Sequence, residues 1–143
     1  MDDLDRKLLA ALAANSSLPT STLARDLGMA RSTVQARIEK LELSGIIAGY
    51  TIRLGDVPGH RRIRATVLLQ IEPRATPSVL QRLKPMPEVE SCQTTSGRVD
   101  LILSLSVEST EALDAALDQI GAIPGVKSSE SLIHLSTKFD RRV

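Results

Sequence analysis

The chain has 143 residues, enough for one ordinary domain or two small ones with a real hydrophobic core. It is 42% hydrophobic and 24% charged, and its only aromatic residues are Tyr50 and Phe139, which argues against roles that depend on stacking unpaired bases. The net charge of +1 does not exclude DNA, because phosphate affinity depends on local clusters of basic residues. It favours a protein that binds DNA as a dimer or a larger assembly.

The cellular compartment is indicated by what the sequence lacks. A single cysteine, Cys92, cannot form an internal disulfide, which fits a reducing compartment. The N-terminus has no basic and apolar signal-peptide regions, and no stretch approaches the roughly 18 apolar residues of a membrane span. We therefore expect a soluble cytoplasmic protein.

The first two predicted helices lie before residue 28. Apolar residues recur on one helical face over residues 4–14, and Asp2 and Asp3 are placed to cap that helix. A short second helix is predicted from about Thr20, and Gly28 ends it.

A third helix is predicted to start three residues after Gly28. Val34, Ile38 and Leu41 form its buried stripe, and Gly45 ends it. The β-prone residues 46–52 then predict a strand, followed by a linker rich in glycine and proline.

The second half of the chain predicts a β-α-β-β-α-β order. Alternating apolar residues or polar-flanked apolar runs predict strands at 63–72, 89–95, 99–107 and 126–137. One helix is expected to start with Thr76 as its cap and Pro77 as its first residue, and another to be capped by Ser109 or Thr110.

These elements predict an α+β fold with two domains. Residues 1–52 form a helix-turn-helix, winged-helix-like domain, residues 53–62 a linker, and residues 63–143 a ferredoxin-like domain with an antiparallel sheet. Two helices cover one face of that sheet, and a second copy of the chain is the simplest cover for the other face.

Residues 20–44 indicate DNA binding. Ala24 is small where two helices meet, Gly28 suits a left-handed turn position, and Val34 packs into the corner, as a tight inter-helix turn requires. Arg and Gln can read base edges, and Ser and Thr can bond bases or phosphates. The residues predicted to contact DNA are Ser21, Arg31, Ser32, Thr33, Gln35, Arg37 and Lys40.

The whole chain, from about residue 2 to 138, resembles the Lrp/AsnC (leucine-responsive, feast/famine) family of transcription regulators. The resemblance is carried by residues 4–9, 23–29, 34–47 and 49–50 (LDRKLL, LARDLGM, VQARIEKLELSGII and GY) and by TSGRVDL at 95–101. No single motif carries it alone.

This resemblance implies a mechanism. Members dimerise through their C-terminal sheets, dimers assemble into octamers or related rings, and small molecules, typically amino acids, bind near a Gly-x-x-Asp loop between dimers. The implied effector-binding residues here are Thr95, Ser96, Gly97, Arg98 and Asp100. Gly97 would let backbone N–H groups approach a carboxylate, whereas Asp100 could hold an ammonium group or simply cap the turn.

Two residues depart from the family pattern. Ala30 stands where the family usually has Ser or a similar cap, so the third helix lacks a capping group unless Ser32 or another residue replaces it. Val99 stands where an aromatic residue is common, which bears on the identity of the effector.

Other conspicuous side chains do not predict a catalytic or metal site. His60 and His134 lie far apart with no cysteine cluster, so we expect no metal and no cofactor. Cys92 has no neighbouring base in the sequence and suits a small buried position. The basic run at 61–64 could touch phosphate or could simply be solvated.

Two alternatives to a transcription regulator stay open. An enzyme similar to sirohaem decarboxylases would use His and Arg residues, but the chain has only two histidines and none at 63–72. A sensor that binds an amino acid and a protein partner, with little DNA contact, would fit the near-neutral N-terminal half and Ala30. We expect a regulator and not an enzyme.

Overall fold

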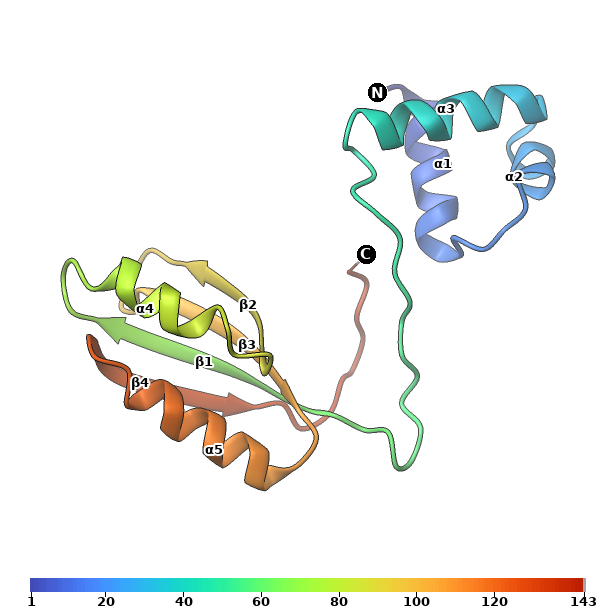
Figure 1. Cartoon of the computed structure of the whole chain (residues 1–143). Coiled ribbons are helices and arrows are strands. Elements are labelled where there is room, and N and C mark those ends of the chain that lie inside the picture. Colours follow the sequence, from blue (N-terminus) through green and yellow to red (C-terminus); the bar gives the residue numbers. More distant parts are fainter. Residues whose placement is uncertain (143) are drawn as a thin grey trace. The chain divides into compact units, whose positions relative to one another are not determined.

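The computed structural model describes residues 1–142, which divide into two compact units, broadly residues 1–55 and 56–140. The first unit contains three helices: α1 (Asp3–Ala14), α2 (Thr20–Leu27) and α3 (Arg31–Leu43) (Figure 1). Its core is small and aliphatic, consisting of Leu8, Leu12, Leu23, Ala24, Val34 and Leu41. The apolar stripes predicted for these helices therefore face one another.

The turn between α2 and α3 has the predicted geometry. Gly28 adopts φ +64°, in the left-handed region that favours glycine, and its N–H bonds the carbonyls of Ala24 and Arg25. Met29 N–H also bonds the Ala24 carbonyl, at 2.9 Å. These bonds satisfy the last carbonyls of α2 and allow α3 to begin three residues after Gly28.

The prediction of a strand at residues 46–52 is wrong. These residues form turns and irregular backbone, and the side chains of Ile46, Tyr50 and Ile52 are 51%, 52% and 79% exposed. Only Ile47 packs against the helical core, and its N–H bonds the Leu41 carbonyl. A strand needs a neighbouring strand as its hydrogen-bonding partner, and residues 46–52 have none among the described residues. Their β-propensity alone therefore does not produce a strand.

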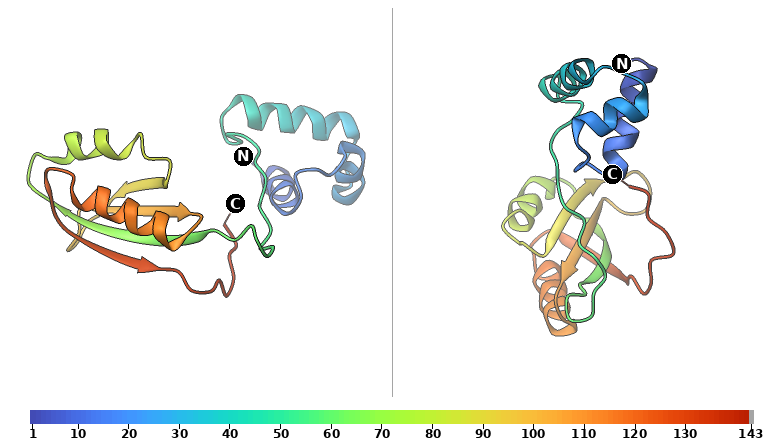
Figure 2. Two further views of the ribbon diagram at one scale, coloured as in Figure 1. Left: turned by 60° about the horizontal axis from the view of Figure 1, so that its bottom comes forward. Right: turned by 90° about the vertical axis from the view of Figure 1, so that its right-hand side faces the viewer.

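The second unit is a four-stranded antiparallel sheet with two helices. In chain order it contains β1 (Ile63–Ile71), α4 (Thr76–Leu83), β2 (Val89–Thr94), β3 (Leu101–Val107), α5 (Thr110–Gly121) and β4 (Val126–Ile133). The strands lie in the order β2-β3-β1-β4. Figures 1 and 2 show α4 and α5 on the same face of the sheet. The predicted fold is confirmed.

The core of this unit lies between the sheet and its helices. The alternating residues Ala65, Val67, Leu69 and Ile71 of β1 are buried there, together with the odd-numbered residues of β3. The opposite face carries no helix. Leu68 and Ile102, which are register partners on the two central strands, lie half-buried on that face. This face is the one that the sequence predicts a second copy to cover.

Several element ends differ from the predictions. The last strand ends at Ile133, not Thr137, because Ile133 is already paired with Ala65 near the start of β1 and little partner strand remains. The third strand starts at Leu101 instead of residue 99. Ala75, and not Thr76, is the cap residue of α4, which has no side-chain capping bond. Ser109 caps α5 by accepting the N–H of Ala112.

Candidate nucleic-acid interface and effector loop

The outer face of α3 is the candidate nucleic-acid interface. Val34 and Leu41 are buried against the core, so the residues on the other side of the helix face outwards. Four of the predicted contact residues line one open hollow beside α1: Ser32, Thr33, Arg37 and Lys40. The rest of its lining is Met1, Asp2, Asp5 and Ala36.

The other three predicted residues are exposed but lie outside that hollow. Ser21 is on α2, whereas Arg31 and Gln35 are on α3. Arg31 and Lys40 make no side-chain hydrogen bond or ion pair with any described residue. They lie nine residues apart, about 13 Å along the helix axis, so both could reach phosphates.

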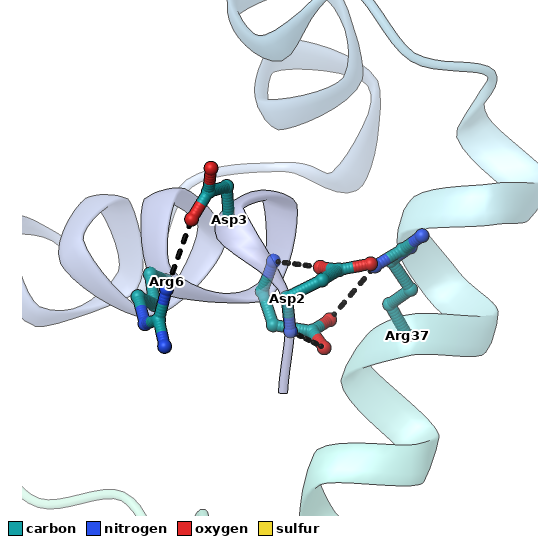
Figure 3. Close-up of polar contacts among 5 residues, drawn as sticks. Asp2, Asp3, Arg6 and Arg37 are labelled. Carbon is teal, nitrogen blue, oxygen red and sulfur yellow. Dashed lines mark hydrogen bonds and ion pairs between the residues drawn. The ribbon is translucent and has the colours of Figure 1, made fainter.

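Arg37 is engaged within the protein. Its Nη1 lies 2.7 Å from each carboxylate oxygen of Asp2 and 3.1 Å from Oδ1 of Asp5, and its side chain is only 28% exposed. Figure 3 shows Arg37 extending from α3 to the N-terminal end of α1, where Asp2 lies. One nitrogen of the guanidinium, Nη1, is therefore already paired with two carboxylates.

Asp2 has two roles in this contact. It is the cap residue of α1: its Oδ1 accepts the N–H of Asp5 at 2.9 Å, and Asp5 accepts the N–H of Asp2 in return. The hydrogen bond from Arg37 and that from the Asp5 backbone hold the pKa of Asp2 at about 2. The same ion pairs raise the pKa of Arg37.

From the sequence, Asp2 is expected only as a helix cap, and Asp5 is not singled out. The spacing of Asp2 and Asp5 is a recognisable capping signal, because two residues three apart can bond each other's backbone. Their partner Arg37 follows more than thirty residues later. No local pattern indicates that pairing.

Ala30 is the cap residue of α3. Its backbone is extended, at φ −68° and ψ 144°, as a cap residue requires, but no side chain accepts a hydrogen bond from the first turn. Ser32 lies inside the helix and does not replace the cap. The structure therefore agrees with the sequence, which suggested that α3 lacks a side-chain capping bond.

The candidate effector loop joins β2 to β3. Gly97 adopts φ +113°, and a Cβ built on it would meet nothing within 4 Å. Thr95 is bonded to the loop itself: its Oγ1 donates to the Val99 carbonyl, and its N–H to the Asp100 carbonyl. Ser96 is exposed at the tip.

Side chains from neighbouring strands hold this loop in place. Gln70 of β1 donates to the Arg98 carbonyl at 2.7 Å, and the Arg98 guanidinium pairs with Glu130 of β4 at 3.2 Å. Asp100 Oδ2 accepts the Ile71 N–H at 2.8 Å. Gln70 and Glu130 are not indicated by any sequence pattern, because their contacts join segments that are far apart in the sequence.

The basic run at residues 61–64 is paired within its own unit. Arg61 pairs with Asp56 at 2.6 Å, and Arg64 with Glu90 at 2.7 Å. Arg62 donates to the hydroxyl and the carbonyl of Ser106, a buried residue of β3. These contacts favour a structural role for the run over phosphate binding.

The remaining conspicuous side chains belong to the unit of residues 56–140. His134 bonds the hydroxyl of Thr66 at 2.8 Å, and burial raises the pKa of the half-buried Cys92 thiol. Within residues 1–142, no three His, Cys, Asp or Glu side chains gather as a metal site would require. In the same part of the chain, no helix is long and apolar enough to span a membrane.

Comparison with known proteins places these features in a family. Residues 1–42 match the AsnC-type helix-turn-helix domain, and residues 53–143 match the Lrp/AsnC ligand binding domain. The chain is 32% identical to the HTH-type transcriptional regulator LrpA of Mycobacterium tuberculosis, over 99% of this chain and 95% of that protein.

Solved structures agree with this assignment. The structure of E. coli AsnC superimposes with a TM-score of 0.89 at 27% identity, covering 100% of this chain and 97% of that one. The M. tuberculosis leucine response regulatory protein (LrpA) gives a TM-score of 0.78 at 32% identity, covering 100% and 98%. The relatives are named as transcriptional regulators, which confirms the prediction that the chain is not an enzyme. The chain belongs to the Lrp/AsnC family of helix-turn-helix transcription regulators.

Proposed function

We propose that the chain is a sequence-specific DNA-binding regulator whose activity is set by a small-molecule effector. The outer face of α3 carries this proposal, because Ser32, Thr33, Gln35 and two cations lie there without intramolecular partners among the described residues. Hydroxyl and amide side chains can read base edges, and Arg31 and Lys40 can bind phosphates. Ser21 on α2 would bind the DNA backbone.

A binding titration tests this proposal. The full-length chain is titrated against labelled duplexes from its own upstream region and against a random duplex of equal length, at several salt concentrations. We expect tighter binding to one upstream duplex and an affinity that falls with salt. Lys40→Gln should lower the salt slope by about 1, and Gln35→Ala should change sequence preference instead. Equal affinity for upstream and random duplexes would refute sequence-specific regulation.

The ligand-binding domain is proposed to take an amino acid at the loop of Thr95, Ser96, Gly97, Arg98 and Asp100. The matched domain is described as ligand binding, and a relative is named as a leucine response regulatory protein. Backbone N–H groups around Gly97 suit a ligand carboxylate. A thermal-shift screen of the twenty amino acids tests this, because a ligand that binds only the folded state raises the unfolding temperature. An amino acid that still raises the unfolding temperature of the Gly97→Val variant would bind at a site other than this loop.

The effector site is proposed to lie between copies of the chain. Half-buried Leu68 and Ile102 occupy the helix-free face of the sheet, and Leu132 of β4 is 49% exposed beside them. A second copy would bury this apolar strip, and dimers would then join into octamers or other rings. Sedimentation should show a dimer or a larger assembly, and Leu68→Asp should reduce its size.

A cytoplasmic location stays a prediction.

A further inference from the structure

The contact between α3 and the start of α1 has no role in the proposed function as stated above. Arg37 is the only α3 residue with a side-chain ion pair to α1 in the described chain, and it pairs with two α1 carboxylates at once. Asp2, the cap residue of α1, bonds the α1 backbone and the α3 side chain through the same carboxylate. The start of α1 and the middle of α3 are thereby joined (Figure 3).

The charges around Arg37 disfavour a phosphate there. Two carboxylates pair with Nη1 of one guanidinium, so the group of Asp2, Asp5 and Arg37 carries a net negative charge. A phosphate reaching Arg37 would approach both carboxylates, and like charges at such distances repel. Lys40 lines the same hollow without any carboxylate partner among the described residues.

Rigid placement of side chains on α3 matters for reading a base sequence. Base contacts depend on hydrogen bonds whose lengths and angles tolerate little displacement. The stripe of α3 that faces the core contributes only two fully buried side chains, Val34 and Leu41. A polar bond on the flank of the helix adds to the constraint that these side chains and the partly buried Ile38 place on its rotation.

We propose that Arg37 is a positioning residue, which holds α3 in the orientation that reads DNA through its bonds to Asp2 and Asp5, and that it does not contact DNA itself. This inference rests on the proposed DNA-binding function. Arg37 is one of the residues that the sequence predicts to contact DNA. The inference gives it a different role from its neighbours Ser32, Thr33 and Lys40.

Salt dependence and sequence preference test the assignment. The full-length chain and its variants are titrated against the preferred upstream duplex and a random duplex at several salt concentrations. We expect Arg37→Gln to leave the salt slope unchanged, whereas the matched control Lys40→Gln lowers it by about 1. Arg37→Gln should reduce the ratio of specific to random affinity about three- to tenfold, and Arg37→Lys should restore part of it. Loss of folded protein alone would weaken both duplexes equally and leave that ratio unchanged.

The aspartate partners supply a second, independent variant. Asp2→Asn with Asp5→Asn removes both negative charges but retains a good cap residue. We expect this double variant to reproduce the loss of preference, and adding Arg37→Gln to it should cause little further loss, because coupled residues are not additive. Helical circular dichroism confirms that each variant is folded.

Opposite results have separate meanings. A lower salt slope for Arg37→Gln would show that Arg37 contacts phosphate and would overturn this assignment alone. A wild-type chain with no preference for any upstream duplex would instead overturn the proposed function, and the positioning role with it.

Discussion

The carboxylate of Asp100 accepts the backbone N–H of Ile71 at 2.8 Å, just beyond the last pair of β1 with β3, which is Leu69 with Leu101. The Leu69 carbonyl accepts the Asp100 N–H, so the backbone groups of Leu69 and Ile71 both face the side of β1 where β3 lies. No β3 residue pairs with Ile71, and the Asp100 carboxylate bonds its N–H instead. In the Gly-x-x-Asp motif of this chain, the aspartate therefore completes the sheet, and a ligand ammonium would have to share it.

Replacing Asp100 with Ala should destabilise the C-terminal unit, whereas Asn should largely preserve it. Ala leaves the N–H of the buried Ile71 unsatisfied, which costs about 1–3 kcal/mol, but the Asn carbonyl can still accept that bond. Urea unfolding of both variants measures the difference. Equal losses for Ala and Asn would mean that the charge of Asp100, and not its bond to Ile71, stabilises the loop.

Ala30→Ser should stabilise the helix-turn-helix unit. Ala30 already has the extended backbone of a cap residue, so a serine hydroxyl there can accept an N–H from the first turn of α3, a gain of about 1 kcal/mol. Ala36→Ser is the matched control, because a serine inside the same helix makes no cap and slightly lowers helix propensity. Thermal unfolding followed by circular dichroism should show a higher midpoint for the first variant only.

Gly125→Ala should destabilise the C-terminal unit strongly. Gly125 has φ +100°, and a Cβ there would lie 2.6 Å from the Cβ of Ala75. Strain and collision together should cost about 2 kcal/mol or more. Gly59→Ala is the control, because Gly59 also has positive φ (+87°) but open space around it. A urea midpoint for Gly125→Ala no lower than that for Gly59→Ala would contradict the close approach.

The carboxyl group of Asp2 should titrate far below its ordinary value. Its pKa is about 2 in the folded chain against 3.8 without these contacts, since Arg37 and the Asp5 N–H stabilise the charged form. Because the folded pKa is the lower one, the stabilisation is complete above about pH 4 and is lost as pH falls towards 2.

Carbon-13 NMR titration of the carboxyl groups measures this midpoint directly. Arg37→Gln should raise it towards 3.8, and Arg6→Gln, which removes only the neighbouring pair with Asp3, should leave it unchanged. An unchanged Asp2 midpoint in the Arg37 variant would show that the ion pair is absent in solution.

Sequence reasoning predicted the elements whose burial pattern is local. The stripes of α1 and α3 and the alternation of β1 place apolar residues on one face at fixed spacing, so each pattern specifies both an element and its buried side. The turn at Gly28 was predictable for a similar reason, because few residues other than glycine adopt its left-handed backbone.

Contacts between distant residues could not be predicted in this way. Arg37 was expected to face DNA from its place on α3, but its bonds to Asp2 and Asp5 depend on how α1 and α3 cross. Residues 46–52 have strand-forming composition, yet a strand also needs a partner that the sequence pattern does not specify. The Asp100 bond to Ile71 likewise depends on where the pairing of β1 with β3 ends.

The irregular segment after α3 contains Tyr50, the chain's only tyrosine, and the chain has no tryptophan. Tyrosine emission from the protein therefore arises at one known position, near the end of the helical unit. Tyr50 is half exposed and lies near Glu42, and both burial and that carboxylate raise the pKa of its phenol. The native protein thus carries an intrinsic fluorophore without any added label. Because Tyr50 lies in the segment that leads from α3 to the sheet unit, a change in that segment should alter the tyrosine fluorescence.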